Sequence, residues 1–251
     1  ASGLDTKKVN FVWASELVRD PEYWKKVLQI ARATTVQRVT RCSQIMGRSE
    51  KEMLYTSQLF YPCMQAADIF HMEVDIAQLG MDQRKVNILA REIGDKLFRY
   101  KPVAVHHHML MGLGEPVDGD AVERAIAMKM SKSQPSNAIF MTDSAAVVEK
   151  KLQEAYCPMK QVNDNPILDY CKHIVFETTK KFVIERPAKF GGDVVFGTYN
   201  DLVKEYSSGK VHPLDLKKAV ARELNALLDP VRTHFEKNKK ARELYGKVSG
   251  Y

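Results

Sequence analysis

Two lysines with a short spacing stand in the segment Met128-Lys129-Met130-Ser131-Lys132-Ser133. An ammonium group is a compact charge on a long, mobile stem, so it can reach a polyphosphate and follow its negative charge as that charge moves. The serines between and after the lysines add hydroxyl donors. A solvated basic loop is the plain alternative for the K-x-x-K spacing alone, but the complete string K-M-S-K-S is much less common.

A second set of polar side chains shares one face of an expected helix. Tyr61, Gln65 and Asp68 are spaced i, i+4 and i+7, and their neighbours Met64 and Ile69 are apolar. A phenol, an amide and a carboxylate that converge in a partly buried place are costly unless they are hydrogen-bonded. Two interpretations stay open: the three groups bind a polar ligand, or they satisfy one another and their neighbours within the protein.

The segment Gly80-Met81-Asp82-Gln83-Arg84-Lys85 combines a glycine, which permits close approach of the backbone, with polar residues in the first turn of an expected helix. Ligands usually bind at such a place, where a strand of an α/β sheet ends. Asp82 alone could be a helix cap, and Arg84 alone could be a surface charge. Their combination with the lysine pair favours a ligand site.

The elements that position these residues alternate between strand and helix. A helix beginning near Gln58 precedes an expected strand at Val74–Ala77, and Asp82 is expected to cap a helix that runs through Leu97. A further strand is expected at Val103–Val105. This alternation predicts an α/β layer with parallel strand pairing.

The character of the sequence changes after residue 144. Thr142-Asp143-Ser144 is a capping sequence, and from there the pattern predicts helix after helix, separated by loops at Asn163–Pro166 and Arg186–Asp193. Asp215 is expected to head a last long helix through Leu228. We therefore place a domain boundary near residue 144.

Composition limits the class of protein. The 251 residues are 45% hydrophobic and 27% charged, which indicates a soluble globular protein, and no apolar run is long enough to predict a membrane-spanning helix. The four cysteines form no C-x-x-C pair, so we expect a reducing, cytoplasmic setting without a disulfide framework. The net charge of +7 permits a polyanionic partner such as RNA. The basic tail Val231–Tyr251 fits a solvated helix face better than a specific RNA contact.

Several segments together resemble tyrosyl-tRNA synthetases of the archaeal and eukaryotic type, most closely the plant and protist members. The segments that carry this resemblance are Tyr61–Asp68, Leu79–Val86, His107–Leu113, Lys129–Ser133, Ala155–Pro158, Lys189–Asp193 and His212–Lys217. The resemblance implies the C-terminal portion of a Rossmann-like parallel-sheet catalytic domain over residues 1–144. It implies an all-α anticodon-binding domain over residues 145–251.

The resemblance also assigns roles toward tyrosine and ATP. Tyr61, Gln65 and Gln83 would hold the ammonium of the substrate tyrosine, and Asp68 would accept its phenolic proton, which agrees with the strong rejection of phenylalanine by a site built for a hydroxyl. The ATP site would be formed by Gly80, Asp82, Met109, Leu110, Lys129, Met130, Ser131 and Lys132. Lys129 and Lys132 would be catalytic, stabilising the departing pyrophosphate. Mg²⁺ is expected with ATP as a counter-charge, without a permanently bound cofactor or a protein metal site.

Three further residues would contact tRNA(Tyr). By resemblance, Arg84 reads the first base pair of the acceptor stem, while Phe190 stacks on the first anticodon base and Asp215 hydrogen-bonds it. The alternatives are that Phe190 belongs to a core and that Asp215 is a helix N-cap. A homodimer is expected from the family, formed through the helical region before Tyr61.

One expected motif is absent from the sequence. Class I synthetases carry a H-I-G-H-type motif that contacts the ATP phosphates, and none of the seven histidines stands in an H-x-G-H string. We therefore expect the chain to begin partway through the nucleotide-binding domain and to need an N-terminal segment, cleaved, carried on another chain or not included, for activity. The alternative is a non-catalytic half of a doubled synthetase that binds tRNA or supports a partner. A tryptophanyl-tRNA synthetase is a third and weaker interpretation.

Overall fold

The computed structural model describes residues 3–42, 55–117, 128, 130 and 134–248. These residues form two compact units. The first, called the sheet unit, contains the described residues between 6 and 109. The second, called the helical unit, contains residues 3–5 and 110–117 and the described residues from 128 onward. The structural division therefore falls at Leu110, whereas the domain boundary expected near residue 144 lies within the helical unit and stays a prediction.

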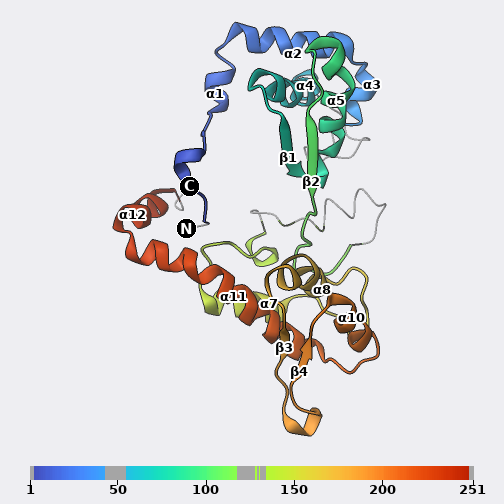
Figure 1. The fold of residues 1–251 in the computed structure, drawn as a ribbon, viewed down its shortest axis with the longest axis vertical. Helices are drawn as coiled ribbons and strands as arrows, with labels where there is room; N and C mark the ends of the chain where they lie inside the picture. Colours follow the sequence, from blue (N-terminus) through green and yellow to red (C-terminus); the bar gives the residue numbers. More distant parts are fainter. Residues whose placement is uncertain (1–2, 43–54, 118–127, 129, 131–133, 249–251) are drawn as a thin grey trace. The chain divides into compact units, whose positions relative to one another are not determined.

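The described part of the sheet unit contains one parallel pair of strands (Figure 1). Strand β1 (Ile76–Gly80) pairs with β2 (Val103–His107), so that Gly80 lies opposite His107. Helix α5 (Arg84–Leu97) connects the two strands and packs on both. This β-α-β arrangement confirms the predicted α/β layer with parallel pairing. The first strand begins at Ile76 rather than Val74, and the second extends two residues past Val105.

Three helices complete the core of the sheet unit. Helix α2 (Pro21–Ala33) packs on α4 (Thr56–His71) and α5, and α3 (Val36–Thr40) also packs on α4. The Asp20 side chain caps α2 by accepting a hydrogen bond from the Glu22 backbone, with a proline at the first helical position. The 3₁₀ turn Thr6–Lys8 and the short helix α1 (Ala14–Leu17) precede α2. Apolar side chains of α2, α4 and α5 form the buried core: Val27, Ile30, Ala66, Ala67, Val86, Leu89 and Ala90.

The helical unit is built around a long helix, α11 (Pro213–Lys237), with α7 (Ala145–Glu154) packed beside it (Figure 1). Its other described helical segments are α8 (Pro166–Tyr170), a π-helical turn (Cys171–Val175), α9 (Phe176–Thr178), α10 (Tyr199–Ser207) and α12 (Lys239–Val248). Two 3₁₀ turns span Pro135–Asn137 and Ala188–Phe190. The Ser144 hydroxyl accepts a hydrogen bond from the Val147 backbone, which confirms the predicted cap of α7.

The expectation of an all-α region after residue 145 is wrong in one respect. Strands β3 (Phe182–Ile184) and β4 (Val194–Phe196) form an antiparallel hairpin. Both strands consist of β-branched and aromatic residues, which favour extended backbone, and Phe182, Ile184 and Phe196 are buried in the unit's core. The predicted loop Arg186–Asp193 is the connection of this hairpin.

The last long helix also differs at both ends from the expectation. Helix α11 begins at Pro213, with His212 at its N-cap, so Asp215 lies in its first turn rather than at its start. The His212 ring accepts a hydrogen bond from the Leu214 backbone at 3.2 Å. The helix continues beyond Leu228 because packing holds its next turn. Val231 is buried, and Arg232 Nε donates to the Asp143 carbonyl at 2.8 Å.

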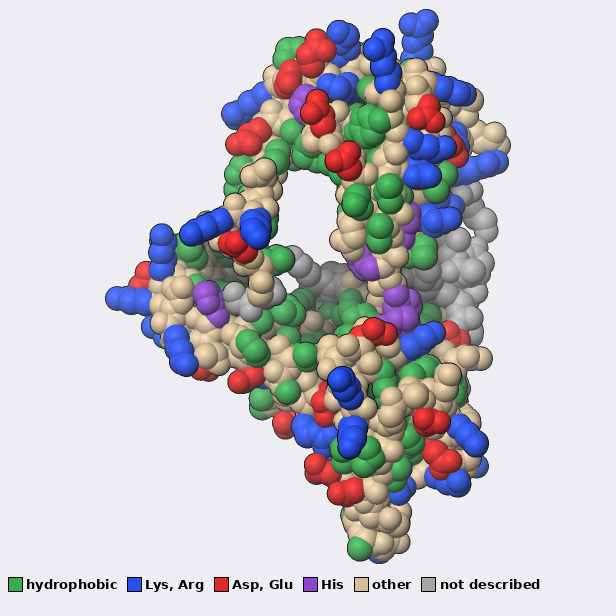
Figure 2. Space-filling view, in the orientation of Figure 1, with side chains coloured by type: hydrophobic (Ala, Val, Ile, Leu, Met, Phe, Trp, Pro, Cys, Tyr) green, Lys and Arg blue, Asp and Glu red, His purple; other side chains and the backbone are tan. Residues whose placement is uncertain are grey.

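The surface carries both positive and negative side chains, as the composition indicates. Lysine and arginine side chains are interspersed with aspartate and glutamate over the face shown in Figure 2. All four cysteines are free thiols. Among the described residues, no helix has the length and apolar character needed to cross a bilayer.

Candidate functional site

The polar face of α4 meets the segment that follows β1. Gln65 Nε2 donates a hydrogen bond to Gln83 Oε1 at 3.0 Å, and both side chains are half-buried. The structure therefore brings together two of the residues predicted to bind the substrate ammonium. Tyr61 lies one turn earlier on α4 and is 49% exposed, so its ring is accessible to a ligand.

Asp68, at the other end of this face, has a partner that the sequence analysis did not find. The Tyr23 hydroxyl donates a hydrogen bond to Asp68 Oδ1 at 2.8 Å and lies 3.3 Å from the Met64 carbonyl. Burial raises the pKa of the Asp68 carboxyl, while the Tyr23 hydrogen bond and the His71 ring oppose that rise. Burial and the neighbouring Asp68 raise the pKa of the Tyr23 phenol. At neutral pH the phenol is therefore the donor.

Charged groups next to this pair are arranged around His71. Its Nε2 lies 3.5 Å from Asp20 Oδ2, and its Nδ1 lies 3.4 Å from Lys26 Nζ. Its ring meets the Tyr23 ring edge-on, with the ring centroids 5.3 Å apart. Asp20, which caps α2, and His71, in the last turn of α4, therefore both belong to the charged surroundings of Asp68.

The carboxyl end of β1 gathers three of the residues predicted to bind ATP. A Cβ atom on Gly80 would collide with the Met109 sulfur and would lie 2.6 Å from Asp82 Oδ1. A side chain at this position would therefore displace the Met109 and Asp82 side chains, although the φ of −66° at Gly80 is accessible to any residue. Asp82 belongs to a 3₁₀ turn (Met81–Gln83), and Gln83 is the boundary residue of α5, so the predicted cap of α5 by Asp82 is wrong.

Arg84 is the first residue of α5 and is exposed, as a residue that contacts an external partner must be. It also acts on a neighbouring ring: burial lowers the pKa of His106, and the Arg84 charge lowers it further. His106 Nε2 lies 3.1 Å from the side-chain nitrogen of the buried Asn87. Burial and the Arg84 charge therefore both favour the neutral form of the His106 ring.

The lysine segment is described only in part. Met130 is half-buried against the core of the helical unit, and the Tyr170 hydroxyl donates to its sulfur at 3.3 Å. Lys129, Ser131 and Lys132 lie outside the described residues, so their contacts with phosphate stay predictions. Leu110 belongs to the helical unit and is half-buried.

Phe190 and Asp215 line one surface hollow of about 650 Å³ in the helical unit. Phe190 is 62% exposed, which rules out its interpretation as a core residue, and Lys189 Nζ lies 5.0 Å from its ring centroid. Asp215 is half-buried in the first turn of α11. The structure thus brings together the two residues predicted to contact the anticodon, although they are 25 positions apart in the sequence (215 − 190).

The loop that carries Phe190 is held by hydrogen bonds from Arg186. The Arg186 backbone donates to Asp193 Oδ1 at 3.0 Å, and Arg186 Nε donates to the Gly192 carbonyl at 2.9 Å. Gly191 and Gly192 have φ values of 95° and 70°, which other residues rarely adopt. These contacts present the Phe190 ring outward on a defined turn.

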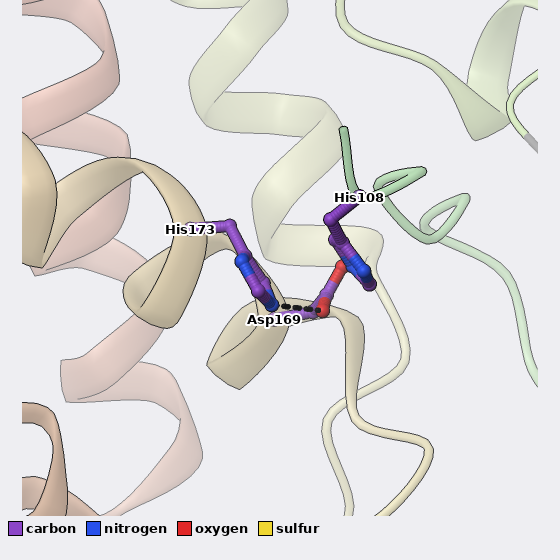
Figure 3. Close-up of side chains that lie close together, drawn as sticks. All are labelled: His108, Asp169 and His173. Atoms are coloured by element: carbon purple, nitrogen blue, oxygen red, sulfur yellow. Dashed lines mark ion pairs between the residues drawn. The ribbon is translucent and has the colours of Figure 1, made fainter. Parts of the chain in front are cut away.

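A histidine–aspartate pair lies elsewhere in the helical unit. His173 Nε2 is 3.6 Å from Asp169 Oδ1 (Figure 3). Asp169 Oδ2 accepts a hydrogen bond from the Met111 backbone at 3.0 Å. His108, also drawn, belongs to the other compact unit. Asp169 thus fixes the segment at Met111 to α8, which is a structural role.

Known proteins resemble this chain in both sequence and fold. The family model for class I tRNA synthetases of the tryptophan and tyrosine type matches residues 1–229. The tyrosine–tRNA ligase of Thermococcus sibiricus is 45% identical over 98% of this chain and 70% of its own length.

The chain belongs to the class I tyrosyl-tRNA synthetases.

Two further members of this family extend the comparison. The cytoplasmic tyrosine–tRNA ligase 1 of Arabidopsis thaliana is 45% identical over the whole of this chain and 63% of its own length. The crystal structure of the tyrosyl-tRNA synthetase from Pyrococcus horikoshii, complexed with L-tyrosine, has a TM-score of 0.88 and 44% identity, over 98% of this chain and 70% of that one. The chain therefore spans about 70% of the archaeal synthetases and less than two thirds of the plant one.

Proposed function

We propose that the protein containing this chain activates tyrosine with ATP and transfers it to tRNA(Tyr). In the first step a tyrosine carboxylate oxygen forms a bond to the α-phosphorus of ATP, and the bond to the β-phosphate breaks, releasing pyrophosphate. In the second step a ribose hydroxyl at the tRNA end attacks the activated carbonyl, and AMP leaves. Neither step requires a covalent bond to the protein, so its contribution is positioning and charge stabilisation.

The observation that carries this proposal is the polar face of α4. Gln65 and Gln83 are in contact, and Asp68 presents a half-buried carboxylate one turn further on. We assign the substrate ammonium to Gln65, Gln83 and Tyr61, and the substrate hydroxyl to Asp68. A half-buried carboxylate disfavours phenylalanine because a ligand without a hydroxyl leaves one of its two oxygens without a donor.

ATP, as its Mg²⁺ complex, is the second substrate in this proposal. Gly80, Asp82 and Met109 gather where β1 ends, which supports a nucleotide site at this edge. Leu110 would extend the contact with the base. Met130 and Ser131 would complete the segment that places Lys129 and Lys132 beside the leaving pyrophosphate.

We assign tRNA to three exposed or half-exposed residues. Arg84 stands at the start of α5, where it is free to meet an acceptor stem, and Phe190 offers an exposed ring for stacking. Asp215 lies in the same hollow as Phe190 and supplies an acceptor for a base edge. The shared hollow supports one binding site for an unpaired base.

A homodimer and a cytoplasmic location belong to the same proposal. Apolar side chains before Tyr61 are exposed in the sheet unit, with exposed fractions of 78% for Phe11 and 71% for Trp13. Light scattering after gel filtration should give twice the monomer mass, and replacing Trp13 by glutamate should lower it. The cytoplasmic location is supported by the free cysteines and by the name of the Arabidopsis relative.

Tyrosine-dependent exchange between ATP and pyrophosphate, measured beside tRNA charging, tests the proposal. Asp68→Ala should impair exchange and lower the preference for tyrosine over phenylalanine while sparing tRNA binding. Asp215→Ala should impair charging while sparing exchange. If both variants lost the same step, the residue assignments would be wrong. Binding of tRNA without any exchange would favour a non-catalytic member of the family instead.

A further inference from the structure

Tyr23 is a buried tyrosine that no motif of the family resemblance includes. Its side chain is 2% exposed, and it lies on α2, whose neighbouring core residues Val27 and Ile30 are fully buried. The ring is fixed by this packing, so its hydroxyl has little freedom to leave Asp68 Oδ1, 2.8 Å away. A phenol placed in this way acts as a preorganised hydrogen-bond donor.

Asp68 needs such a donor for the role assigned to it. An ionised carboxylate only accepts hydrogen bonds, whereas a protonated one also donates and can pair with a wider range of ligands. Partial burial favours the protonated form of Asp68. A neighbour that donates to the carboxylate shifts the balance back toward the ionised acceptor.

We propose that Tyr23 is a positioning residue for tyrosine recognition, whose hydroxyl holds Asp68 Oδ1 so that the ionised carboxylate offers its second oxygen to the substrate hydroxyl. This inference rests on the proposed binding of tyrosine at α4. It makes discrimination between tyrosine and phenylalanine depend on a residue of α2 that itself does not touch the substrate.

The other groups that act on Asp68 are few in the described part of the chain. His71 on α4 favours the ionised carboxylate, and His71 is in turn paired with Asp20 and Lys26 from α2. These three residues are unchanged when the Tyr23 hydroxyl alone is removed. A change in the titration of Asp68 on that removal therefore reports the Tyr23 hydrogen bond.

Tyr23→Phe removes the hydroxyl and keeps the ring. Because a hydrogen bond to a charged group is stronger than one between neutral groups, its loss should raise the KM for tyrosine about tenfold, with kcat nearly unchanged. The pH below which tyrosine affinity is lost should move upward, and the preference over phenylalanine should fall by a similar factor. The Asp68 carboxyl, followed by carbon NMR in the same variant, should titrate at a higher pH.

Tyr100→Phe is the matched control. The Tyr100 hydroxyl donates to the Ile69 carbonyl at 3.1 Å, so this variant also removes a phenolic hydrogen bond to α4, next to Asp68 but not to it. It should leave the KM for tyrosine and its pH dependence unchanged. Equal effects in both variants, or no effect of Tyr23→Phe on the KM and the Asp68 titration, would overturn the inference.

Two further results separate this inference from the proposed function. A wild-type protein that binds no tyrosine would refute the proposed function, while the Asp68 titration in Tyr23→Phe would still decide whether the hydrogen bond controls the carboxylate. If Tyr23→Phe does not fold, Asp68→Asn provides the second test. In that variant the Tyr23 phenol, followed by ultraviolet titration, should ionise at lower pH than in the wild type, and an unchanged titration would overturn the inference.

Discussion

Replacing Asp68 by asparagine tests what the negative charge on the polar face of α4 contributes to tyrosine binding. Asparagine has nearly the same shape, and its Oδ1 can keep the hydrogen bond from Tyr23. The amide nitrogen then faces the ligand where the wild type has a carboxylate oxygen. The substrate hydroxyl loses an ionised acceptor and must accept a hydrogen bond instead of donating one.

The size of this effect follows from the strength of a hydrogen bond to a charged group. A charge-assisted hydrogen bond contributes about 1.5–3 kcal/mol, and each 1.4 kcal/mol is about a factor of ten, so the KM for tyrosine should rise roughly 10- to 100-fold. Phenylalanine makes no such bond, so its KM should change little and the preference for tyrosine should fall by the same factor. Exchange of pyrophosphate with ATP at varied tyrosine and phenylalanine concentrations measures both.

The same substitution has a defined effect on stability. Because burial raises the pKa of the Asp68 carboxyl, the native state binds a proton more tightly than the unfolded chain. The free energy of unfolding therefore falls as pH rises from the ordinary value of about 4 through the raised value. Asparagine has no charge to bury, so Asp68→Asn should remove this slope and be at least as stable as the wild type at neutral pH. Urea unfolding at several pH values measures the slope. An unchanged KM for tyrosine together with an unchanged slope would refute the reasoning.

Three other perturbations test separate parts of the account. Gly80→Ala should raise the KM for ATP at least tenfold, which is about 1.4 kcal/mol, because the new Cβ would meet the Asp82 side chain. Gly246→Ala is the control. Its new Cβ lies in open space, so this variant should leave the KM for ATP unchanged. Lys151→Met should lower the free energy of unfolding by about 3–5 kcal/mol in urea titrations, because it leaves the largely buried Asp143 carboxylate, 2.7 Å away, without its ion pair. Phe190→Ala should weaken tRNA charging by about 1–3 kcal/mol while sparing exchange, if the ring stacks on a base.

The order and type of the elements around β1 followed from local patterns in the sequence. The strand at Val103 and the Ser144 cap were correctly predicted, since a run of β-branched residues and a serine before an apolar helical pattern act within a few positions. The hairpin of β3 and β4 was missed because each strand has three residues, too few for an alternating pattern to separate from a loop.

The contacts of the candidate site were only partly accessible from the sequence. The i, i+4, i+7 spacing placed Gln65 and Asp68 on one face of α4, but their partners Gln83 and Tyr23 lie 18 and 45 positions away. Such pairings depend on how helices pack, which no local pattern specifies. The prediction that Asp82 caps α5 was wrong because a 3₁₀ turn precedes α5, so the helix begins only at Arg84.

Pyrophosphate exchange with ATP by the full-length wild-type protein, compared between tyrosine and phenylalanine, tests the central claim most directly. The account predicts exchange that depends on tyrosine, with phenylalanine poorer by a factor on the order of 10⁴ or more, as expected of a site built around a hydroxyl acceptor. Equal exchange with both amino acids, or exchange with neither, would contradict the assignment of Asp68 and of the α4 face as the tyrosine site.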